Sequence, residues 1–232
     1  MTWLGLPAPL WQALILSIEL ATVTTVVLMV VGIPLAHWLN TTRFFGRSFL
    51  EVIISLPIVL PPTVIGFYLL VTFAPQTPLG QLWQVVFGHG LTFSFAGLVV
   101  GSVLYSFPFA VQPYQAALRS VPKELVEAAA AMGATSWQVT RHLRLRWARA
   151  GIFAGSGLAF AHTMGEFGVV LMLGGNLEGK TRVSSIALYD LTQALEFEQA
   201  YRYAAVLLVV SMLILIMVSL LQKHMEIRQP TM

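Results

Sequence analysis

The chain has 232 residues, of which 57% are hydrophobic and 10% are charged, and its mean hydropathy is +0.78. This composition lies outside the usual range of soluble domains and indicates that a lipid bilayer surrounds most of the chain. The formal net charge of +3 does not indicate nucleic-acid binding, because the few basic residues cluster between apolar runs, and the lack of cysteine excludes disulfides, thiolate chemistry and sulfur-ligated metals.

Five apolar segments are long enough to cross a bilayer, which takes about 20 residues. They cover residues 11–37, 48–74, 91–117, 150–173 and 201–221. No Lys or Arg precedes the first segment, so we interpret it as a retained span rather than a signal peptide. The segments predict an all-α membrane protein with a single transmembrane domain over residues 1–232, whose termini lie on opposite sides.

The distribution of basic residues predicts the orientation, because loops rich in Lys and Arg stay in the cytoplasm. The residues before the first span and the loop of residues 75–90 contain neither, and the loop after the fourth span has Lys180 and Arg182, with Arg202 at its edge. The other ten lie on the opposite side: Arg43, Arg47, Arg119, Lys123, Arg141, Arg144, Arg146, Arg149, Lys223 and Arg228. We therefore expect the N-terminus outside and the C-terminus in the cytoplasm.

The second span carries Pro57, Pro61 and Pro62 near its middle, where each removes a backbone donor and leaves carbonyl groups that hydrocarbon cannot satisfy. This backbone must face protein or a watery path. One interpretation makes Pro62 and Thr63 the start of a half-helix, whose amides and positive dipole end face a passing anion. The other interpretation is a kink that shapes the bundle.

The connection between the third and fourth spans, residues 118–149, is expected to form a helix, a turn and a second helix against the membrane. Residues 123–132 are helix formers, and Gly133 supplies a stop. A second short helix is expected over residues 135–142, with Thr135 as a capping residue. A basic element of this kind, with small alanines on one side, suits insertion into a groove of a soluble partner.

The fourth span contains His162 and Glu166, four residues apart and therefore expected on one face of a helix. Gly165 and Gly168 invite close approach by a neighbouring helix. Because ionisable groups inside a membrane indicate function by default, a gating role and a hydrogen-bonded packing pair both stay open. Two ligands are too few for a metal site, so none is expected.

The loop after the fourth span matches the phosphate-loop pattern at Gly174, Gly179, Lys180 and Thr181. We expect no nucleotide there, because the pattern follows a membrane span and has no soluble fold around it. The glycines instead end the span. Between residues 184 and 200, apolar residues at helical spacing predict a helix on the outer surface.

The segment between the third and fourth spans contains a spaced motif, formed by Glu127, Ala128, Ala129, Gly133, Leu143, Leu145 and Arg146. It resembles the signature of the membrane subunits of bacterial ABC importers, which is Glu-Ala-Ala, three residues, Gly, nine residues, then Ile-x-Leu-Pro. Leu143 and Leu145 stand at the Ile and Leu positions, and Arg146 stands in place of the family proline. The resemblance implies that residues 118–149 are the cytoplasmic coupling loop, which docks on the ATPase subunit through Glu127 and Gly133.

The resemblance covers nearly the whole chain and is strongest to molybdate permeases, which are related to sulfate and tungstate permeases. It is carried by the run from Ser55 to Pro62 with Gly66, the run from Ser106 to Pro108, and the run from His162 to Gly168. It implies a type I ABC importer permease in the inner or plasma membrane of a prokaryote. Such a permease subunit is not an enzyme.

The resemblance also implies the partners of the chain: a second copy of itself, a cytoplasmic ATPase dimer that binds ATP and Mg, a periplasmic or lipid-anchored oxyanion-binding protein, and membrane lipid. The subunit itself is expected to bind no cofactor, metal or nucleic acid.

The function expected from the sequence is therefore the permease of a molybdate importer, which forms the translocation path as a dimer. The candidate residues of the path are Pro61, Pro62, Thr63, Gly66, His162 and Glu166. Since no Lys or Arg occurs in the middle of a span, a dianion would meet hydroxyls, amides and water. Tungstate and sulfate or thiosulfate stay open as substrates. A secondary transporter and a membrane-embedded enzyme are the alternative classes, although an enzyme would need more convergent groups than His162 and Glu166.

Overall fold

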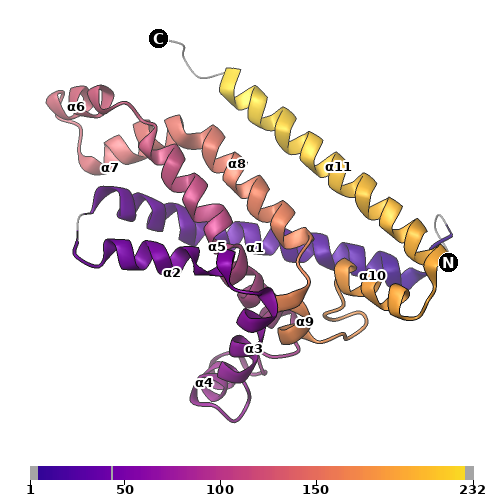
Figure 1. The fold of residues 1–232 in the computed structure, drawn as a ribbon. Coiled ribbons are helices and arrows are strands. Elements are labelled where there is room, and N and C mark those ends of the chain that lie inside the picture. Colours follow the sequence, from indigo (N-terminus) through magenta and orange to yellow (C-terminus); the bar gives the residue numbers. More distant parts are fainter. Residues whose placement is uncertain (1–4, 43, 228–232) are drawn as a thin grey trace.

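The computed structural model describes residues 5–42 and 44–227, so Arg43 and Arg228 lie outside the described residues. The described chain is helical (Figure 1). Three helices are long and apolar enough to cross a membrane on their own: α1 (Ala8–Thr41), α5 (Phe95–Arg119) and α11 (Phe197–Ile227). Two bent helix pairs raise the number of candidate spans to as many as five. These elements coincide with the five expected apolar segments.

The second span is broken at Pro61 and Pro62, whereas Pro57 lies inside an unbroken helix. Helix α2 (Arg47–Val59) ends before Pro61, and α3 (Pro62–Thr72) starts afresh at an angle of 111°. Proline is tolerated in the first turn of a helix, because the amides of that turn have no acceptor within the helix. Further along a helix, proline removes one backbone hydrogen bond. The backbone therefore forms the helix start that the half-helix interpretation expects, rather than a kink within one continuous helix.

The fourth span is broken near Gly165. Helix α8 (Leu145–Met164) ends there, and α9 (Gly168–Gly174) follows at 61° to it. His162 lies within α8 but Glu166 lies in the break, so the expectation that both share one helix face is wrong. The α-helical geometry on which that spacing argument rests stops at Met164, where the Gly165 amide donates to the carbonyls of both Ala161 and His162, at 3.3 and 3.2 Å.

Helices α1, α5 and α8 form the packed centre of the bundle, and small residues let them approach closely. Tyr114 of α5 is fully buried, and its hydroxyl is 2.7 Å from Ser156 Oγ of α8. A Cβ atom added to Gly32 or Gly155 would lie 3.2 or 3.0 Å from the Tyr114 ring. Glycine at helix contacts is the usual means of tight packing where lipid supplies no hydrophobic driving force.

The connection between the third and fourth spans begins as expected and then departs from the prediction. Helix α6 (Lys123–Ala131) stops at Gly133, whose φ is +85°. Thr135 caps the next helix, since its Oγ1 accepts from the Gln138 amide at 3.3 Å. However, residues 135–142 are not a separate helix, because α7 (Ser136–Gln138) continues through the π-helical segment η1 (Val139–Arg144) directly into α8.

The continuity of α7, η1 and α8 has a physical reason in the sequence. Neither proline nor glycine occurs between Thr135 and Gly151, and Arg146 supplies an amide where the family signature has proline. Helix hydrogen bonding therefore runs unbroken from the loop into the membrane.

Two features of the loops at the other end of the bundle from α6 were predicted incompletely. Helix α4 (Pro78–Phe87) lies in the loop of residues 75–90, where no helix was expected. Its signals were a capping Thr77, whose Oγ1 accepts from the Gly80 amide at 3.1 Å, and Gly88 with a φ of +75°. The helix expected over residues 184–200 is divided: α10 (Ser184–Gln193) ends before the turn at Leu195, whose φ is +60°.

Candidate functional site

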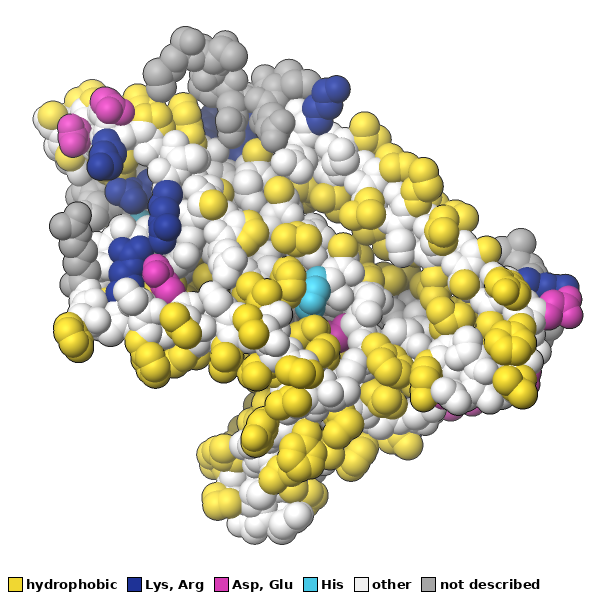
Figure 2. Space-filling view, in the orientation of Figure 1, with side chains coloured by type: hydrophobic (Ala, Val, Ile, Leu, Met, Phe, Trp, Pro, Cys, Tyr) yellow, Lys and Arg dark blue, Asp and Glu magenta, His cyan; other side chains and the backbone are white. Residues whose placement is uncertain are grey.

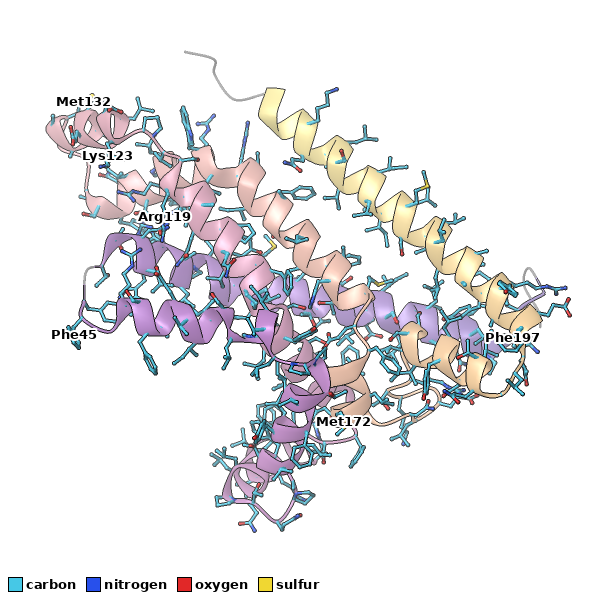
Figure 3. All side chains as sticks on the ribbon, viewed as in Figure 1. Phe45, Arg119, Lys123, Met132, Met172 and Phe197 are labelled. Atoms are coloured by element: carbon cyan, nitrogen blue, oxygen red, sulfur yellow. The ribbon has the colours of Figure 1, made fainter. Side chains whose placement is uncertain are left out.

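The two helix breaks lie against each other in the bundle (Figure 1). A Cβ atom added to Gly168 of α9 would lie 2.8 Å from Pro62 Cβ and 3.1 Å from the Thr63 backbone nitrogen. One added to Gly66 of α3 would lie 2.7 Å from Met172 Cβ, and Figure 3 labels Met172 at this contact. Glycine at both positions therefore brings the N-terminal turn of α3 against the start of α9.

His162 is held by α5 rather than by Glu166. Its Nδ1 is hydrogen-bonded to Ser106 Oγ at 2.9 Å, and the same hydroxyl lies 2.9 Å from Thr163 Oγ1. The imidazole stacks on Phe109 with ring centroids 3.9 Å apart. These contacts hold the C-terminal end of α8 against α5. His162 therefore has the contacts of a packing residue.

Glu166 is buried without a partner. It is 4% exposed, and no hydrogen bond in the described part of the chain reaches either carboxylate oxygen. Ser102 Oγ of α5 is fully buried and, like the carboxylate of Glu166, has no hydrogen-bond partner in the described part of the chain. Its backbone carbonyl accepts from Ser185 Oγ of α10 at 2.5 Å.

Figure 2 shows a histidine and an acidic side chain next to each other in the middle of the apolar face. Burying a carboxyl group without a partner costs several kcal/mol or more, so a fold retains one mainly where function requires it. Ser102 carried no signal in the sequence, because an isolated serine is common in membrane helices.

The described residues contain no group of three or more His, Asp and Glu side chains that could hold a metal ion. The phosphate-loop match is part of a tight turn instead. Thr181 is fully buried, donates its hydroxyl to the Gly174 carbonyl at 2.7 Å and accepts from the Leu177 amide at 3.2 Å. Its hydroxyl is therefore engaged within the chain, and Gly174 ends α9 as expected.

The coupling-loop residues named from the sequence are divided between two sides of α6. Glu127 shares a face with Lys123 and Val126, and together they line a cavity between α6 and the bundle. Ala128 is exposed and does not line it, while Ala129 is half-buried. Of the remaining candidates, Gly133 forms the turn, Leu143 lies in η1 and Leu145 begins α8.

The tip of this loop exposes two large apolar side chains that the sequence interpretation did not single out. Met132 is 83% exposed and Trp137 is 69% exposed, on either side of the Gly133 turn. Figure 3 shows Met132 at the far end of the molecule. Exposed apolar side chains rimmed by polar residues are typical of a surface that meets another protein.

The family described as "Binding-protein-dependent transport system inner membrane component" matches residues 29–228. The chain belongs to this family. The permease is 46% identical over 203 residues to the molybdenum transport system permease protein ModB of Azotobacter vinelandii, an alignment that covers 88% of this chain and 90% of that protein. It is 33% identical over 195 residues to the sulfate transport system permease protein CysT of Escherichia coli (strain K12), with 84% and 70% covered.

The permease also matches a chain of the crystal structure of a bacterial ABC transporter involved in the import of the acidic polysaccharide alginate. The TM-score is 0.78 at 18% sequence identity, over 94% of this chain and 80% of that chain. At this identity the match shows the fold, which is that of a type I ABC importer permease. The predicted fold class is thus confirmed, as is an inner membrane location, while the orientation of the termini stays a prediction.

Proposed function

We propose that this chain is the permease subunit of a molybdate ABC importer. The observation that carries the proposal is the 46% identity to a molybdenum transport permease over 88% of this chain. The 33% identity to a sulfate transport permease makes sulfate the alternative substrate. In this proposal the chain is one transmembrane domain that binds no cofactor, and ATP and Mg bind a separate ATPase subunit.

The path of the anion is proposed to pass the helix breaks, between two copies of the chain. Five spans are too few to enclose a path alone, and closed two-fold symmetry is the commonest way to complete one. In the first turn of α3, Pro62 has no amide proton, and the Val64 and Ile65 amides donate to the Pro61 carbonyl at 2.9 and 3.4 Å. The Thr63 amide is left without an acceptor in its own helix, and with the positive end of the helix dipole it offers a weak contact to an oxyanion, which suits passage better than storage.

The exposed loop tip is proposed to dock on the ATPase subunit on the cytoplasmic side. Trp137 and Met132 supply apolar contact area, and Ala128 and Gly133 allow close approach. Because α7 continues through η1 into α8, a movement of the loop reaches the fourth span directly. A binding protein delivers the anion on the opposite side. Each ligand shifts the equilibrium between the inward-open and outward-open states only as far as its affinity for the two states differs.

The test of the proposed function is uptake of labelled molybdate by cells that make the permease, its ATPase and its binding protein. We expect uptake to be suppressed by excess unlabelled molybdate and to persist in an equal excess of sulfate. An equal excess of tungstate is tested in the same way, to distinguish a molybdate permease from a tungstate permease. If sulfate suppresses uptake as strongly as molybdate does, the substrate assignment is wrong, although the family assignment is not.

A further inference from the structure

A cavity of about 370 Å³ lies where α6 meets the ends of α1 and α5. Its polar lining consists of Asn40, Arg119, Lys123, Glu127 and Arg144. The volume falls within the range of roughly 300 to 1,000 Å³ that is common for small-ligand sites. Figure 3 places Arg119 and Lys123 at this junction, on the inner side of α6.

The lining of this cavity is positively charged. Three cations reach it from three different elements, Arg119 from α5, Lys123 from α6 and Arg144 from η1, and Glu127 is the acidic residue among its lining residues. Neither Lys123 nor Arg144 forms an ion pair with any residue in the ranges 5–42 and 44–227. Like charges around a small volume repel one another, so an anion in the cavity would stabilise the arrangement.

One of the cations, Arg119, is held in place by Asn40 and by an ion pair. Asn40 at the end of α1 accepts from Arg119 Nε at 2.7 Å and donates its Nδ2 to the Gln115 carbonyl at 2.9 Å. Glu51 lies 3.5 Å from Arg119 Nη2, but it is also paired with Arg47 at 3.1 Å and does not line the cavity. The guanidinium of Arg119 is therefore oriented before any ligand arrives, which lowers the cost of binding one.

Figure 2 shows that Lys and Arg side chains gather at this end of the molecule. The positive-inside rule assigns this end to the cytoplasm, where both inorganic phosphate and anionic lipid headgroups occur. Arginine forks match the oxygens of a tetrahedral oxyanion, and the lysine ammonium adds a point charge.

We propose that this cavity is a binding site for a phosphate group, supplied either by free phosphate or by the headgroup of an anionic phospholipid. The bound group bridges α5, α6 and η1 and so fixes α6 against the bundle. The site lies outside the helix breaks and does not depend on which anion the permease transports.

The test uses the full chain in nanodiscs of digalactosyldiacylglycerol, a bilayer lipid that contains no phosphate group. In the first arm, binding of radiolabelled inorganic phosphate is measured by equilibrium dialysis. In the second arm, a fraction of phosphatidylglycerol is added, and its retention on the protein is measured by native mass spectrometry. If phosphate binds in the first arm and phosphatidylglycerol displaces it in the second, the two ligands compete for one site.

Three variants and a control decide the result. Lys123→Gln and Arg144→Gln are each expected to weaken binding about tenfold, because each removes a charge-assisted hydrogen bond. Glu127→Gln is expected to strengthen binding, since it removes the negative charge from the lining. Arg141→Gln is the matched control, because Arg141 lies in η1 but is exposed and does not line the cavity.

Binding in either arm that follows this pattern supports the site, and the arm in which it occurs names the source of the phosphate group. Absence of binding in both arms overturns the proposal. Equal loss in Arg141→Gln also overturns it, because it would show attraction by net charge alone. Elution of each variant by gel filtration at the volume of the unmodified protein excludes loss of the fold as the cause.

Discussion

The second and fourth spans are both broken in the middle, but by different means. Between α2 and α3 the break lies at Pro61 and Pro62, where the ring of Pro62 disfavours the helical conformation at Pro61 and Pro61 has an extended ψ of 134°. Between α8 and α9 it lies at Gly165, which keeps its amide. The first break is fixed by covalent structure, and the second is held by tertiary contacts. The bend of the fourth span therefore depends on its contacts with α3 and α10.

The largest loss of stability and uptake is expected from a substitution at the contact between the two breaks. Gly168→Ala places a methyl group 2.8 Å from Pro62 Cβ and should lower the free energy of unfolding by about 2 kcal/mol, with a loss of uptake that is larger than the loss of protein. Thermal unfolding in detergent and uptake per membrane-inserted permease measure the two effects.

Gly165→Ala is the matched control for this substitution. A Cβ atom there would meet nothing nearer than 3.8 Å, so we expect a change of less than about 0.5 kcal/mol. Equal effects at Gly165 and Gly168 would show that the close approach of the two breaks does not carry the result.

The second prediction tests whether the ATPase docks on the loop that precedes the fourth span rather than on the loop that precedes the second. Trp137→Glu puts a charge on the exposed loop tip and should reduce co-purification of the ATPase about tenfold, because one buried aromatic contact is worth about 1.4 kcal/mol or more. Phe45→Glu is the control, since Phe45 is fully exposed before the second span. Loss of ATPase binding in Phe45→Glu but not in Trp137→Glu would contradict the assigned surface.

The third prediction separates the two ionisable residues near the fourth break. His162→Ala removes a hydrogen bond and a ring stack and should destabilise the protein by about 1 to 3 kcal/mol. Glu166→Gln removes no hydrogen bond between side chains, so thermal stability should not fall, whereas uptake should fall about fivefold. If Glu166→Gln is unstable and His162→Ala is not, the two roles are reversed.

A small effect is also expected at the proline break. Pro62→Ala restores one amide in the first turn of α3, where the helix has no acceptor for it, so the free energy of unfolding should change by less than about 1 kcal/mol. Denaturation of the purified variant measures this change. A marked loss of stability would mean that Pro61 alone does not fix the break.

The comparison also shows which parts of the structure the sequence could predict. The break at Pro61 and Pro62 was visible because two consecutive prolines disfavour a helix more strongly than the single Pro57, which lies inside α2. The departure of Glu166 from the helix was not visible, because glycine permits a break without requiring one, and the contacts that produce it come from α3 and α10. Gly133 was predicted correctly as a stop, since its positive φ is a local requirement.

The same distinction explains the loop. Helix formers and the Thr135 cap gave the starts of α6 and α7, which depend on neighbouring residues. The fusion of α7 with α8 depends on the absence of proline and glycine over many residues, which the prediction of a separate helix over residues 135–142 did not take into account. Ser102 and the loop-tip side chains Met132 and Trp137 acquire significance only from their exposure or burial in the folded chain.

The π-helical segment η1 has a geometric consequence of its own. The Leu145 amide bonds to the Thr140 carbonyl, five residues back, so this turn holds one residue more than an α-helical turn. Each residue advances an α-helix by about 100° around its axis. The extra residue therefore sets the angular phase between the loop and the glycine face of α8, and a single-residue deletion in η1 would point α6 in a new direction while the membrane helices kept their packing.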